Sequence, residues 1–390
     1  MDSVAGSNLT ISLITIGPGE EVWERFGHNA IQVEDHSLGT RVAYNYGLFS
    51  FRQENFVLRF IQGRMLYWMA GLDAREDLDR YVAAHRSIWA QELDLPPASR
   101  LELKKFLEWN ALDENKFYRY DYYRDNCSTR VRDALDRVTG GALRRQTQNT
   151  ILPVTYRWHT RRLTASSLPV YTGLELLLGP RSDRPLSAWE EMFLPQKLQE
   201  HIRRVSLTGA DGRKTSLVKA ERTLYLSDRY PVPDAPPNLV GYYFAAGAIV
   251  GAAFYLLGRA GASRRWARGT FLVAVGLWAS VSTVAGLVLA TMWAFTDHVI
   301  VRGNQNSLQF CILSAVLLVV LRSWFVNRSP GGNAAPRMAF VLMLLSLFGL
   351  LLHLIPGAAQ VNGEIIALVL PVLAGILLGL RIPSESTARA

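Results

Sequence analysis

The feature that most constrains this 390-residue chain is the uneven distribution of its charges. From residue 239 onward it holds ten arginines, no lysine and three acids, whereas the part before residue 239 has 32 basic against 30 acidic side chains. Five apolar stretches occupy the charge-poor part, and each can cross a hydrocarbon core about 30 Å thick. The sequence therefore predicts a globular N-terminal domain followed by an all-helical membrane domain.

We expect the globular domain over residues 1–230 and a stiff linker with four prolines over 231–238. The membrane domain then covers residues 239–390. Its predicted spans lie near 239–258, 270–295, 307–326, 338–353 and 365–380.

The charges of the loops predict the orientation in the membrane. Arginines gather in the loops after the first and third spans and in the C-terminal tail, whereas the second loop has only Arg302 and the fourth has no cation. Because basic residues accumulate on the cytoplasmic side, the second and fourth loops and the N-terminal domain are expected outside. We therefore expect a multi-pass protein of a bacterial cytoplasmic membrane with a periplasmic domain. Residues 1–10 contain no export signal, so we expect the signal to have been cleaved or to lie upstream.

Composition and motifs exclude several classes of protein. The charge of the N-terminal part is nearly balanced, which argues against a basic nucleic-acid-binding domain. Apolar and aromatic residues are plentiful throughout, which argues against large-scale disorder. We find no P-loop, dinucleotide fingerprint or zinc-type cluster. We therefore expect no nucleic-acid partner, no metal and no cofactor.

Hydropathy patterns predict an α+β fold for the N-terminal domain. Alternation of apolar and polar residues predicts strands over 9–16, 27–34 and 41–46. Amphipathic patterns predict helices over 73–89, 99–112 and 126–138. A capping box at Ser187 and Glu190 predicts one further helix, which ends before Pro195.

Cys127 is the strongest candidate for chemistry. It is the one cysteine before residue 239, in the sequence RDNCSTRVRD, at the predicted start of a helix. The unpaired N–H groups and the positive end of the helix dipole favour a thiolate there, and the same groups can stabilise an oxyanion. The alternative is an inert buried cysteine.

A nucleophilic thiol requires a base. His28, in RFGHNAIQV, lies at the start of a predicted strand whose alternation places Ala30 and Gln32 on the same face. His298, in FTDHVIVRGNQN, lies in the outward second loop. A strand histidine can also be purely structural, so the hypothesis depends on Cys127 and His28 being taken together.

The order of the two residues resembles that of the circularly permuted, NlpC-type papain-like proteins, in which a strand histidine precedes a helix-N-terminal cysteine. Lecithin:retinol acyltransferase-like enzymes belong to that group. The strings GPGEEVWERFGHNAIQV, YNYGLF and YYRDNCSTRVRDAL resemble, more closely, the Lnb-type bacterial lipoprotein N-acyltransferases. The later strings GLELLLG, FLPQKL and FTDH are similar as well, so the resemblance extends from about Thr15 to Asn306.

This resemblance implies N-acylation of bacterial lipoproteins at the membrane. A fatty acyl chain would leave a phospholipid, form a thioester on Cys127, and pass to the amino group of an S-diacylglyceryl-cysteine lipoprotein. His28 would act as the base in both steps. Two covalent half-reactions imply ping-pong kinetics. The implied partners are a phospholipid acyl donor and a diacylated lipoprotein acceptor.

The resemblance also implies a third residue that orients the histidine. Relatives place a polar residue on the strand after the histidine strand, and Asn45 is the favoured candidate here, ahead of Tyr44 and Tyr46. A purely structural role at the turn before Gly47 is the alternative. Three further residues are candidates to donate to an oxyanion or to support the pair: Asn126, Tyr123 and Asp125.

Two groups of polar residues are candidates for binding the lipid or the acceptor. Three arginines flank the cysteine and can meet a phosphate or form surface ion pairs, namely Arg124, Arg130 and Arg132. Three residues of the second outward loop can bind a head group or cap helix ends, namely His298, Asn304 and Asn306.

Three other functions compete with acyl transfer to an amine. A papain-like cell-wall peptidase would explain the cysteine and the histidine but not the number of membrane spans. A phospholipase or thioesterase would use water as the acceptor. A non-catalytic interaction module would leave both the unpaired exported cysteine and its histidine unexplained.

Overall fold

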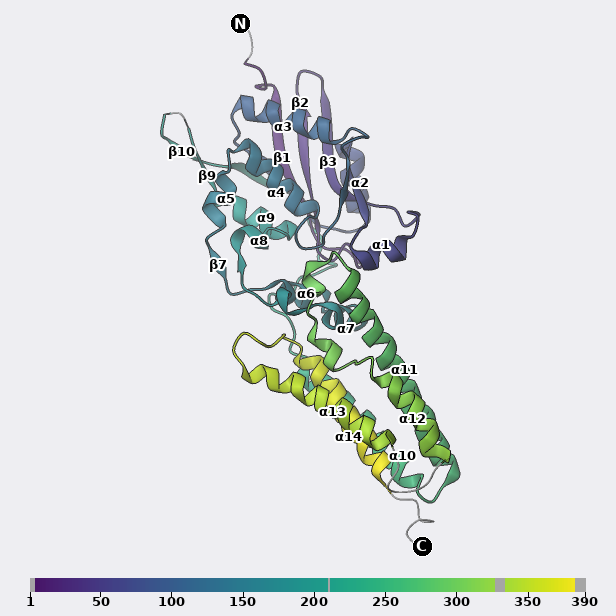
Figure 1. Cartoon of the computed structure of the whole chain (residues 1–390). Helices are drawn as coiled ribbons and strands as arrows, with labels where there is room; N and C mark the ends of the chain where they lie inside the picture. The colour runs from purple at the N-terminus through teal and green to yellow at the C-terminus, as the bar shows by residue number, and fades with distance from the viewer. Residues whose placement is uncertain (1–3, 210, 327–333, 383–390) are drawn as a thin grey trace. The chain divides into compact units, whose positions relative to one another are not determined.

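A computed structural model describes residues 4–209, 211–326 and 334–382 of the chain. It divides into two compact units (Figure 1). The N-terminal unit comprises Met1–Ser166 and Arg184–Pro236, and the membrane unit comprises Ser167–Asp183 and Pro237–Ala390.

The N-terminal unit is built on a seven-stranded antiparallel sheet with the strand order β11-β5-β1-β2-β3-β4-β6. Its strands are β1 (Leu9–Ile16), β2 (His28–Asp35), β3 (Thr40–Leu48), β4 (Leu66–Asp73), β5 (Ile88–Leu93), β6 (Phe117–Arg119) and β11 (Val218–Tyr225). The first three strands confirm the predicted strands to within about two residues, because alternation of apolar and polar residues has the two-residue period of a strand.

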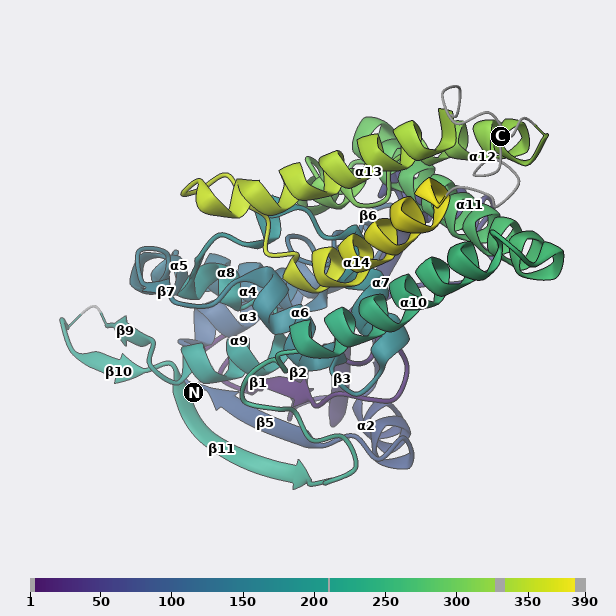
Figure 2. The ribbon, with the colours of Figure 1, turned by 90° about the horizontal axis from the view of Figure 1, so that it is seen from below.

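Helices cover both faces of this sheet. Helices α3 (Pro97–Asn110), α4 (Cys127–Val138) and α9 (Pro195–Ile202) pack on one face around residues such as Ile11 and Ile31. Helix α2 (Ala74–Ala83) packs on the other face, around Ile14 and Ile16 (Figure 2). The sheet therefore has a layer of helices on one face and helix α2 on part of the other, and its edge strand β11 is mostly exposed.

The predicted helix over 73–89 is wrong in its last third. Helix α2 ends at Ala83, and Ile88 already begins strand β5 between β1 and β11. His85 adopts a left-handed conformation with φ 54° and breaks the helix. Neither glycine nor proline marks this break in the sequence, so the local pattern could not reveal it.

Smaller elements complete the N-terminal unit. They are helices α1 (Phe56–Gln62), α5 (Ala142–Thr147), α6 (Tyr156–Thr164) and α8 (Ala188–Glu191), and strands β7 (Ile151–Leu152), β8 (Leu186–Ser187), β9 (Ser206–Thr208) and β10 (Lys214–Ser216). The capping box of Ser187 and Glu190 is present at the start of α8 as predicted.

The membrane unit is helical, with four helices in the described residues long and apolar enough to cross a membrane. Its helices are α7 (Leu168–Leu177), α10 (Val240–Ala260), α11 (Arg265–Phe295), α12 (Ser314–Val326), α13 (Ala334–Leu351) and α14 (Gly363–Arg381), with short 3-10 turns η1 (Pro180–Ser182), η2 (Val299–Val301), η3 (Gln305–Leu308) and η4 (Leu352–Leu354). Four of the five predicted spans coincide with α10, α11, α13 and α14.

The predicted third span, 307–326, is not a continuous helix. Among the described residues, helix α12 (Ser314–Val326) begins at Ser314, so residues 307–313 of the predicted span precede it. The residues before it include Asn306 and Gln309, whose side chains bond to backbone groups elsewhere in the unit. These polar contacts hold the segment in short turns instead of a membrane-spanning helix.

Helices α10 and α14 approach each other through glycines. A Cβ atom at Gly251 would lie 2.3 Å from the carbonyl oxygen of Pro371, and one at Gly375 would lie 2.0 Å from that of Gly251. No side chain fits at such distances, so the two backbones pack directly. Small residues at helix crossings are typical of membrane bundles, where close packing replaces the hydrophobic driving force.

Residues 167–183, which the predicted boundaries place in the N-terminal domain, belong to the membrane unit. The Tyr171 hydroxyl of α7 donates to Glu364 Oε1 at 2.8 Å, at the start of α14. Asn304 Nδ2 donates to the carbonyl oxygens of Leu176 and Leu177 at 2.7 and 2.9 Å. The GLELLLG string is therefore a helix of the membrane unit, because its last carbonyls are capped by that unit's own loop.

Candidate active site

Cys127 is the first residue of α4, and the local sequence fixes this start. The Asn126 side chain accepts from the Thr129 backbone N–H at 2.9 Å, and the Thr129 hydroxyl accepts from the Asn126 N–H at 2.7 Å. This reciprocal cap places Cys127 at the positive end of the helix. Both N–H bonds of the Asn126 amide are used, since Nδ2 donates to the carbonyls of Tyr122 and Phe193. Asn126 thus caps the helix and has no N–H left for an oxyanion.

The sheet register brings His28 and Asn45 together. Asn45 pairs with Ala30 across β2 and β3, so it is the diagonal neighbour of His28 on the same face. His28 Nε2 lies 2.8 Å from Asn45 Oδ1. Tyr44 and Tyr46 point to the opposite face and lie in the core beneath α3 and α4. Of the three residues considered for this role, Asn45 is therefore the one beside the imidazole.

A hydrogen-bond chain continues from Asn45 to the helix on that face. Asn45 Nδ2 donates to Asp77 Oδ2 at 2.8 Å, and Asp77 Oδ1 accepts from Arg80 at 2.7 Å. Because an ion-paired carboxylate only accepts, the Asn45 amide must turn its oxygen toward the imidazole. Because the amide oxygen Oδ1 of Asn45 can only accept, the neutral His28 ring must carry its proton on Nε2. Nδ1 is then the unprotonated nitrogen, available to the thiol.

His28 and Cys127 form a hydrogen-bonded pair with opposite pKa shifts. Burial lowers the pKa of His28, but the charge and hydrogen bond of Cys127 and the bond to Asn45 outweigh burial, so the pKa is raised. Burial raises the pKa of Cys127, but the charge and hydrogen bond of His28 and the N–H groups of Asn29 and Ser128 outweigh it, so the pKa is lowered. The arrangement favours a thiolate beside an imidazolium.

Gly47 forms the wall next to the sulfur. It lies in a bulged part of β3 with φ +90°, in the left-handed region that favours glycine. A Cβ atom at this position would lie 3.2 Å from the Cys127 Cβ and 3.5 Å from the Tyr120 ring. The glycine of the YNYGLF string therefore lets β3 pass close to Cys127, where a side chain would be crowded.

Sequence reasoning missed Asp77, Tyr81 and Arg86, all within the region predicted as one helix. The buried Arg86 guanidinium pairs with Glu24 at 3.1 Å and lies 5.1 Å from the centre of the Tyr81 ring. The Tyr81 ring lies 6.0 Å from the His28 ring. The acidic first turn of α2 was recognised only as a helix start, and nothing local indicated that one of its acids bonds to a strand residue.

The polar residues that flank Cys127 bond mainly to one another. Arg130 Nη2 donates to Asp125 Oδ2 at 2.6 Å and stacks on an aromatic ring. Arg132 is buried and pairs with Asp133. The Tyr123 hydroxyl lies 2.9 Å from a threonine hydroxyl of α6. Of the three arginines considered for phosphate binding, Arg124 is the exposed one.

The residues of the second outward loop lie in the membrane unit and have their own partners. Asn306 Nδ2 donates to the carbonyls of Glu175 and Leu176 at 2.9 and 3.0 Å, and its Oδ1 accepts from Asn362 at 2.9 Å. Asn304 bonds the same helix end. Both asparagines therefore serve as helix caps, the second of the two roles considered for them. His298 precedes η2, and its N–H donates to Thr296.

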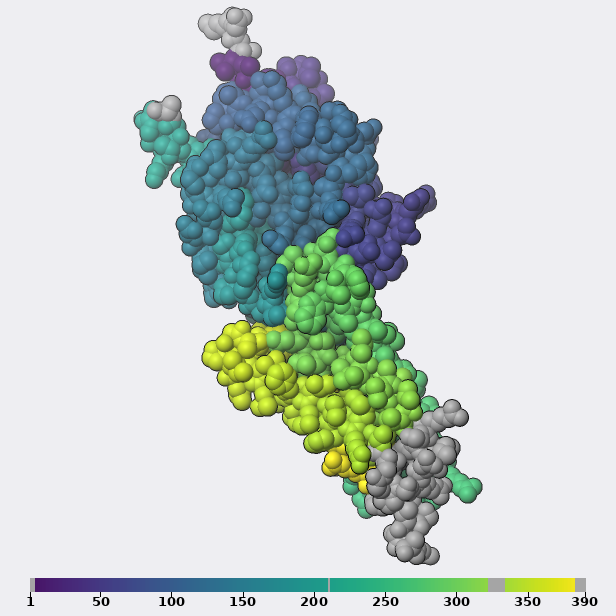
Figure 3. All heavy atoms as spheres, viewed as in Figure 1, coloured from purple at the N-terminus to yellow at the C-terminus, as the bar shows by residue number. Residues whose placement is uncertain are grey.

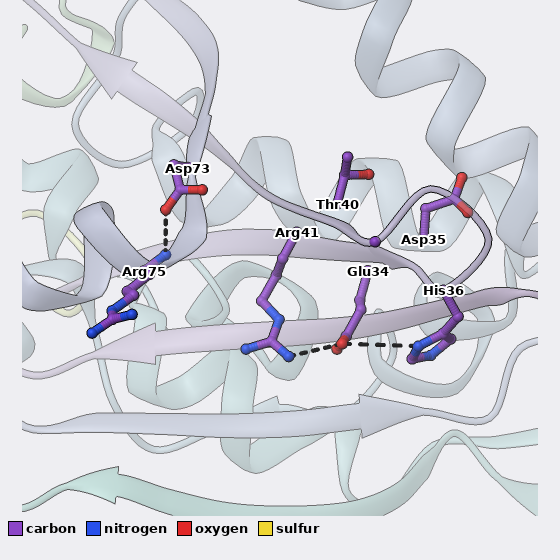
Figure 4. A pocket seen from close by; sticks show the side chains of 8 residues that line it. Glu34, Asp35, His36, Thr40, Arg41, Asp73 and Arg75 are labelled. Carbon is purple, nitrogen blue, oxygen red and sulfur yellow. Dashed lines mark hydrogen bonds and ion pairs between the residues drawn. The ribbon is translucent and has the colours of Figure 1, made fainter.

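A polar cleft of about 260 Å³ lies at the far end of the β2–β3 hairpin (Figure 4). Its charged side chains bond one another, as Arg41 does with Glu34 at 2.7 Å. His28 and Asp35 are the two ends of β2, so the cleft lies about 23 Å along the strand from the histidine. In the described parts of the chain, no group of three or more His, Cys, Asp or Glu is placed to hold a metal.

The fold and the site define a class. The protein is a multi-pass membrane protein with an α+β domain in which a strand histidine contacts a helix-N-terminal cysteine. More particularly, residues 1–162 match the family model described as the Lnb N-terminal periplasmic domain, in agreement with the resemblance of the motifs. No curated protein and no solved structure matches the chain. The family and the four apolar helices together make it an inner-membrane protein with a periplasmic domain.

Proposed function

We propose that the protein is a lipoprotein N-acyltransferase that works through a thioester on Cys127. The observation that supports this most is the pairing of Cys127 with His28, whose tautomer is fixed by Asn45 and Asp77. A thiol with a lowered pKa, a positioned base and a membrane anchor fit an acyl donor that resides in the bilayer.

In the first half-reaction, Nδ1 of His28 takes the thiol proton and the sulfur attacks an ester carbonyl carbon of a phospholipid. The oxyanion forms on the carbon bonded to the sulfur, and the backbone N–H groups of Asn29 and Ser128, which bond the thiol, are the candidates to stabilise it. The intermediate collapses to the thioester. The glycerol oxygen leaves with the proton from His28, as a lysophospholipid.

In the second half-reaction, the neutral amine of a diacylated lipoprotein attacks the thioester carbonyl. His28 accepts the proton of the amine, the sulfur leaves as thiolate, and the product is an amide. The amine must be unprotonated, which an α-amino pKa near about 7.7–8.0 makes accessible. Both half-reactions use the same base, in agreement with a ping-pong scheme.

The intact mass of the full-length protein after incubation with phospholipid tests this proposal. We expect a mass increase of one acyl chain in the wild type and in Cys311→Ala, and none in Cys127→Ala. A diacylated lipopeptide should then remove the adduct and gain the same mass. Release of free fatty acid by water alone would identify a phospholipase, and cleavage of a cell-wall peptide without an adduct would identify a peptidase. Either result would overturn the proposal.

A further inference from the structure

Helix α1 has an unusual surface for an element of a globular domain. Its sequence is FVLRFIQ, yet none of its residues is buried. Val57, Leu58 and Phe60 expose 67%, 53% and 38% of their surface. Isolated apolar residues are common on protein surfaces, but a contiguous apolar patch is typical of a surface that contacts a partner or a membrane.

The apolar surface continues beyond the helix. Trp23, on the loop before His28, packs edge-on against Phe51 with ring centres 5.2 Å apart, and about half of each side chain is exposed. In the space-filling view, α1 and its neighbours form a projection on the surface of the N-terminal unit (Figure 3). We call α1, Trp23 and Phe51 the apolar projection.

Aromatic rings lead from this projection to the thiol. The Phe51 ring lies 4.9 Å from that of Phe49, which lies 5.1 Å from that of Tyr67. Tyr67 stacks on Tyr120 at 3.9 Å, and both the Tyr120 ring and Cys127 lie close to Gly47, within 3.5 Å and 3.2 Å of where its Cβ atom would be. An apolar path of four rings (Phe51, Phe49, Tyr67 and Tyr120) therefore joins the exposed projection to Cys127.

The charges beside α1 favour a lipid surface as its occupant. Between residues 50 and 66 there are three arginines, Arg52, Arg59 and Arg64, and one acid, Glu54. An apolar helix with basic residues is the pattern of segments that lie in the interface of an anionic bilayer. The chain itself has membrane-spanning helices, so a bilayer is the apolar phase always present around it.

We infer that the apolar projection inserts into the outer surface of the bilayer and that a phospholipid acyl chain moves along the four rings to Cys127. The inference rests on the proposed function for the destination of the chain, but insertion itself does not depend on any reaction. The projection would contact a phospholipid in the bilayer, which is insoluble in water. The four rings would then provide apolar contacts for its acyl chain in place of neighbouring lipids.

The first test measures insertion directly. Full-length Cys127→Ala, Cys311→Ala protein with Leu58→Cys is labelled with an environment-sensitive fluorophore and reconstituted in phosphatidylcholine–phosphatidylglycerol vesicles. We expect quenching by lipids that bear a quencher on the acyl chain. The same label at Leu38→Cys, an exposed leucine at the far end of the β2–β3 hairpin, should not be quenched. Absence of quenching at position 58 would overturn the inference. Quenching that disappears when the ratio of protein to lipid is lowered would also overturn it. Such a result would mean that a second copy of the protein, and not the bilayer, covers the label.

The second test measures delivery. Val57→Asp with Leu58→Asp should slow acylation of Cys127 by vesicle phospholipid about tenfold or more, because two charged groups would have to enter the bilayer. Acylation by a water-soluble short-chain thioester and alkylation of the thiol should be unchanged. Leu38→Asp is the matched control. Equal slowing with both donors would show damage to the site and overturn the inference.

The two proposals fail differently. If the wild type forms no adduct with any phospholipid, the proposed function fails while quenching at position 58 still tests insertion. If adducts form normally in the aspartate variant, the acyltransferase proposal stands and the apolar projection is not the entry surface.

Discussion

Two buried polar networks, one in each unit, show how similar side chains serve different ends. In the N-terminal unit, Asp77, Asn45 and His28 form a chain that ends at Cys127. In the membrane unit, Asn304 and Asn306 bond backbone carbonyls and other amides. The first network ends at a titratable nucleophile. In the second network, the amide groups of Asn304 and Asn306 bond backbone carbonyls and other amides.

The two networks therefore differ in role: one orients the His28 ring, and the other caps the end of a helix. An amide that bonds backbone carbonyls at a helix end satisfies groups that would otherwise be buried without partners, and its removal costs stability. An amide that orients an imidazole determines which ring nitrogen carries the proton, and its removal should change the reactivity of the thiol. Substitutions in the two networks should therefore change different quantities.

The largest expected effect is that of His28→Ala. Removal of the base should lower the rate of Cys127 acylation about 10²–10⁴-fold. The pKa of Cys127 is lowered mainly by His28 against the effect of burial, so the alkylation rate of the thiol should rise at higher pH in the variant than in the wild type. The measurement is a pH profile of alkylation beside the intact-mass assay. An unshifted profile would show that His28 does not act on the thiol.

In contrast to His28→Ala, the substitution Asn306→Ala should lower the stability of the protein and leave the reactivity of Cys127 unchanged. It removes the two hydrogen bonds that Asn306 Nδ2 donates to the carbonyls of Glu175 and Leu176, which should lower the free energy of unfolding by about 1–3 kcal/mol. Thermal unfolding in detergent measures this loss. The alkylation profile of Cys127 should stay as in the wild type. A shifted profile with unchanged stability would mean that Asn306 belongs with the catalytic residues.

Asp77→Asn tests the link between the carboxylate and the imidazole. Without a partner that only accepts, the Asn45 amide can reverse and favour the other tautomer, so acylation should fall about tenfold at unchanged fold. Asp79→Asn, an exposed neighbour on the same helix, is the matched control. An equal effect of both substitutions would assign the loss to the helix and not to the tautomer.

The smallest effect is expected for His298→Ala. This residue lies on the outward loop of the membrane unit, so we expect it to position lipid and to leave proton transfer unaffected. The substitution should raise the phospholipid concentration needed for half-maximal acylation and leave the pH profile of thiol alkylation unchanged. A shift as large as that of His28→Ala would place His298 in the catalytic site.

The features that could be predicted from the sequence are those that depend on residues close together in the chain. Alternation predicted β1, β2 and β3, and the amphipathic pattern over 126–138 predicted α4. The resemblance to relatives indicated Asn45, and the register of β2 and β3 places it beside His28. The fold class, the resemblance of residues 1–162 to the Lnb N-terminal periplasmic domain and the periplasmic location of that domain are confirmed. The catalytic roles of these residues stay predictions.

The features that could not be predicted depend on contacts between residues far apart in the chain. Asp77 joins the site because α2 packs across β3, and no local pattern reports that contact. The third span was overestimated because the hydropathy average over 307–326 hides Gln309 among apolar neighbours, and Asn306 lies just before that window. Residues 167–183 were assigned to the wrong part of the chain for a related reason. Their partners lie more than a hundred residues later.

The assignment of 167–183 has a practical consequence for dissecting the protein. The polypeptide passes from one unit to the other three times, near residues 166, 183 and 236. A fragment that stops at the proline-rich linker therefore keeps α7 but loses Glu364, Asn304 and Asn306, and exposes a leucine-rich helix to water. A soluble catalytic fragment needs a short hydrophilic bridge from 166 to 184 as well as the C-terminal truncation.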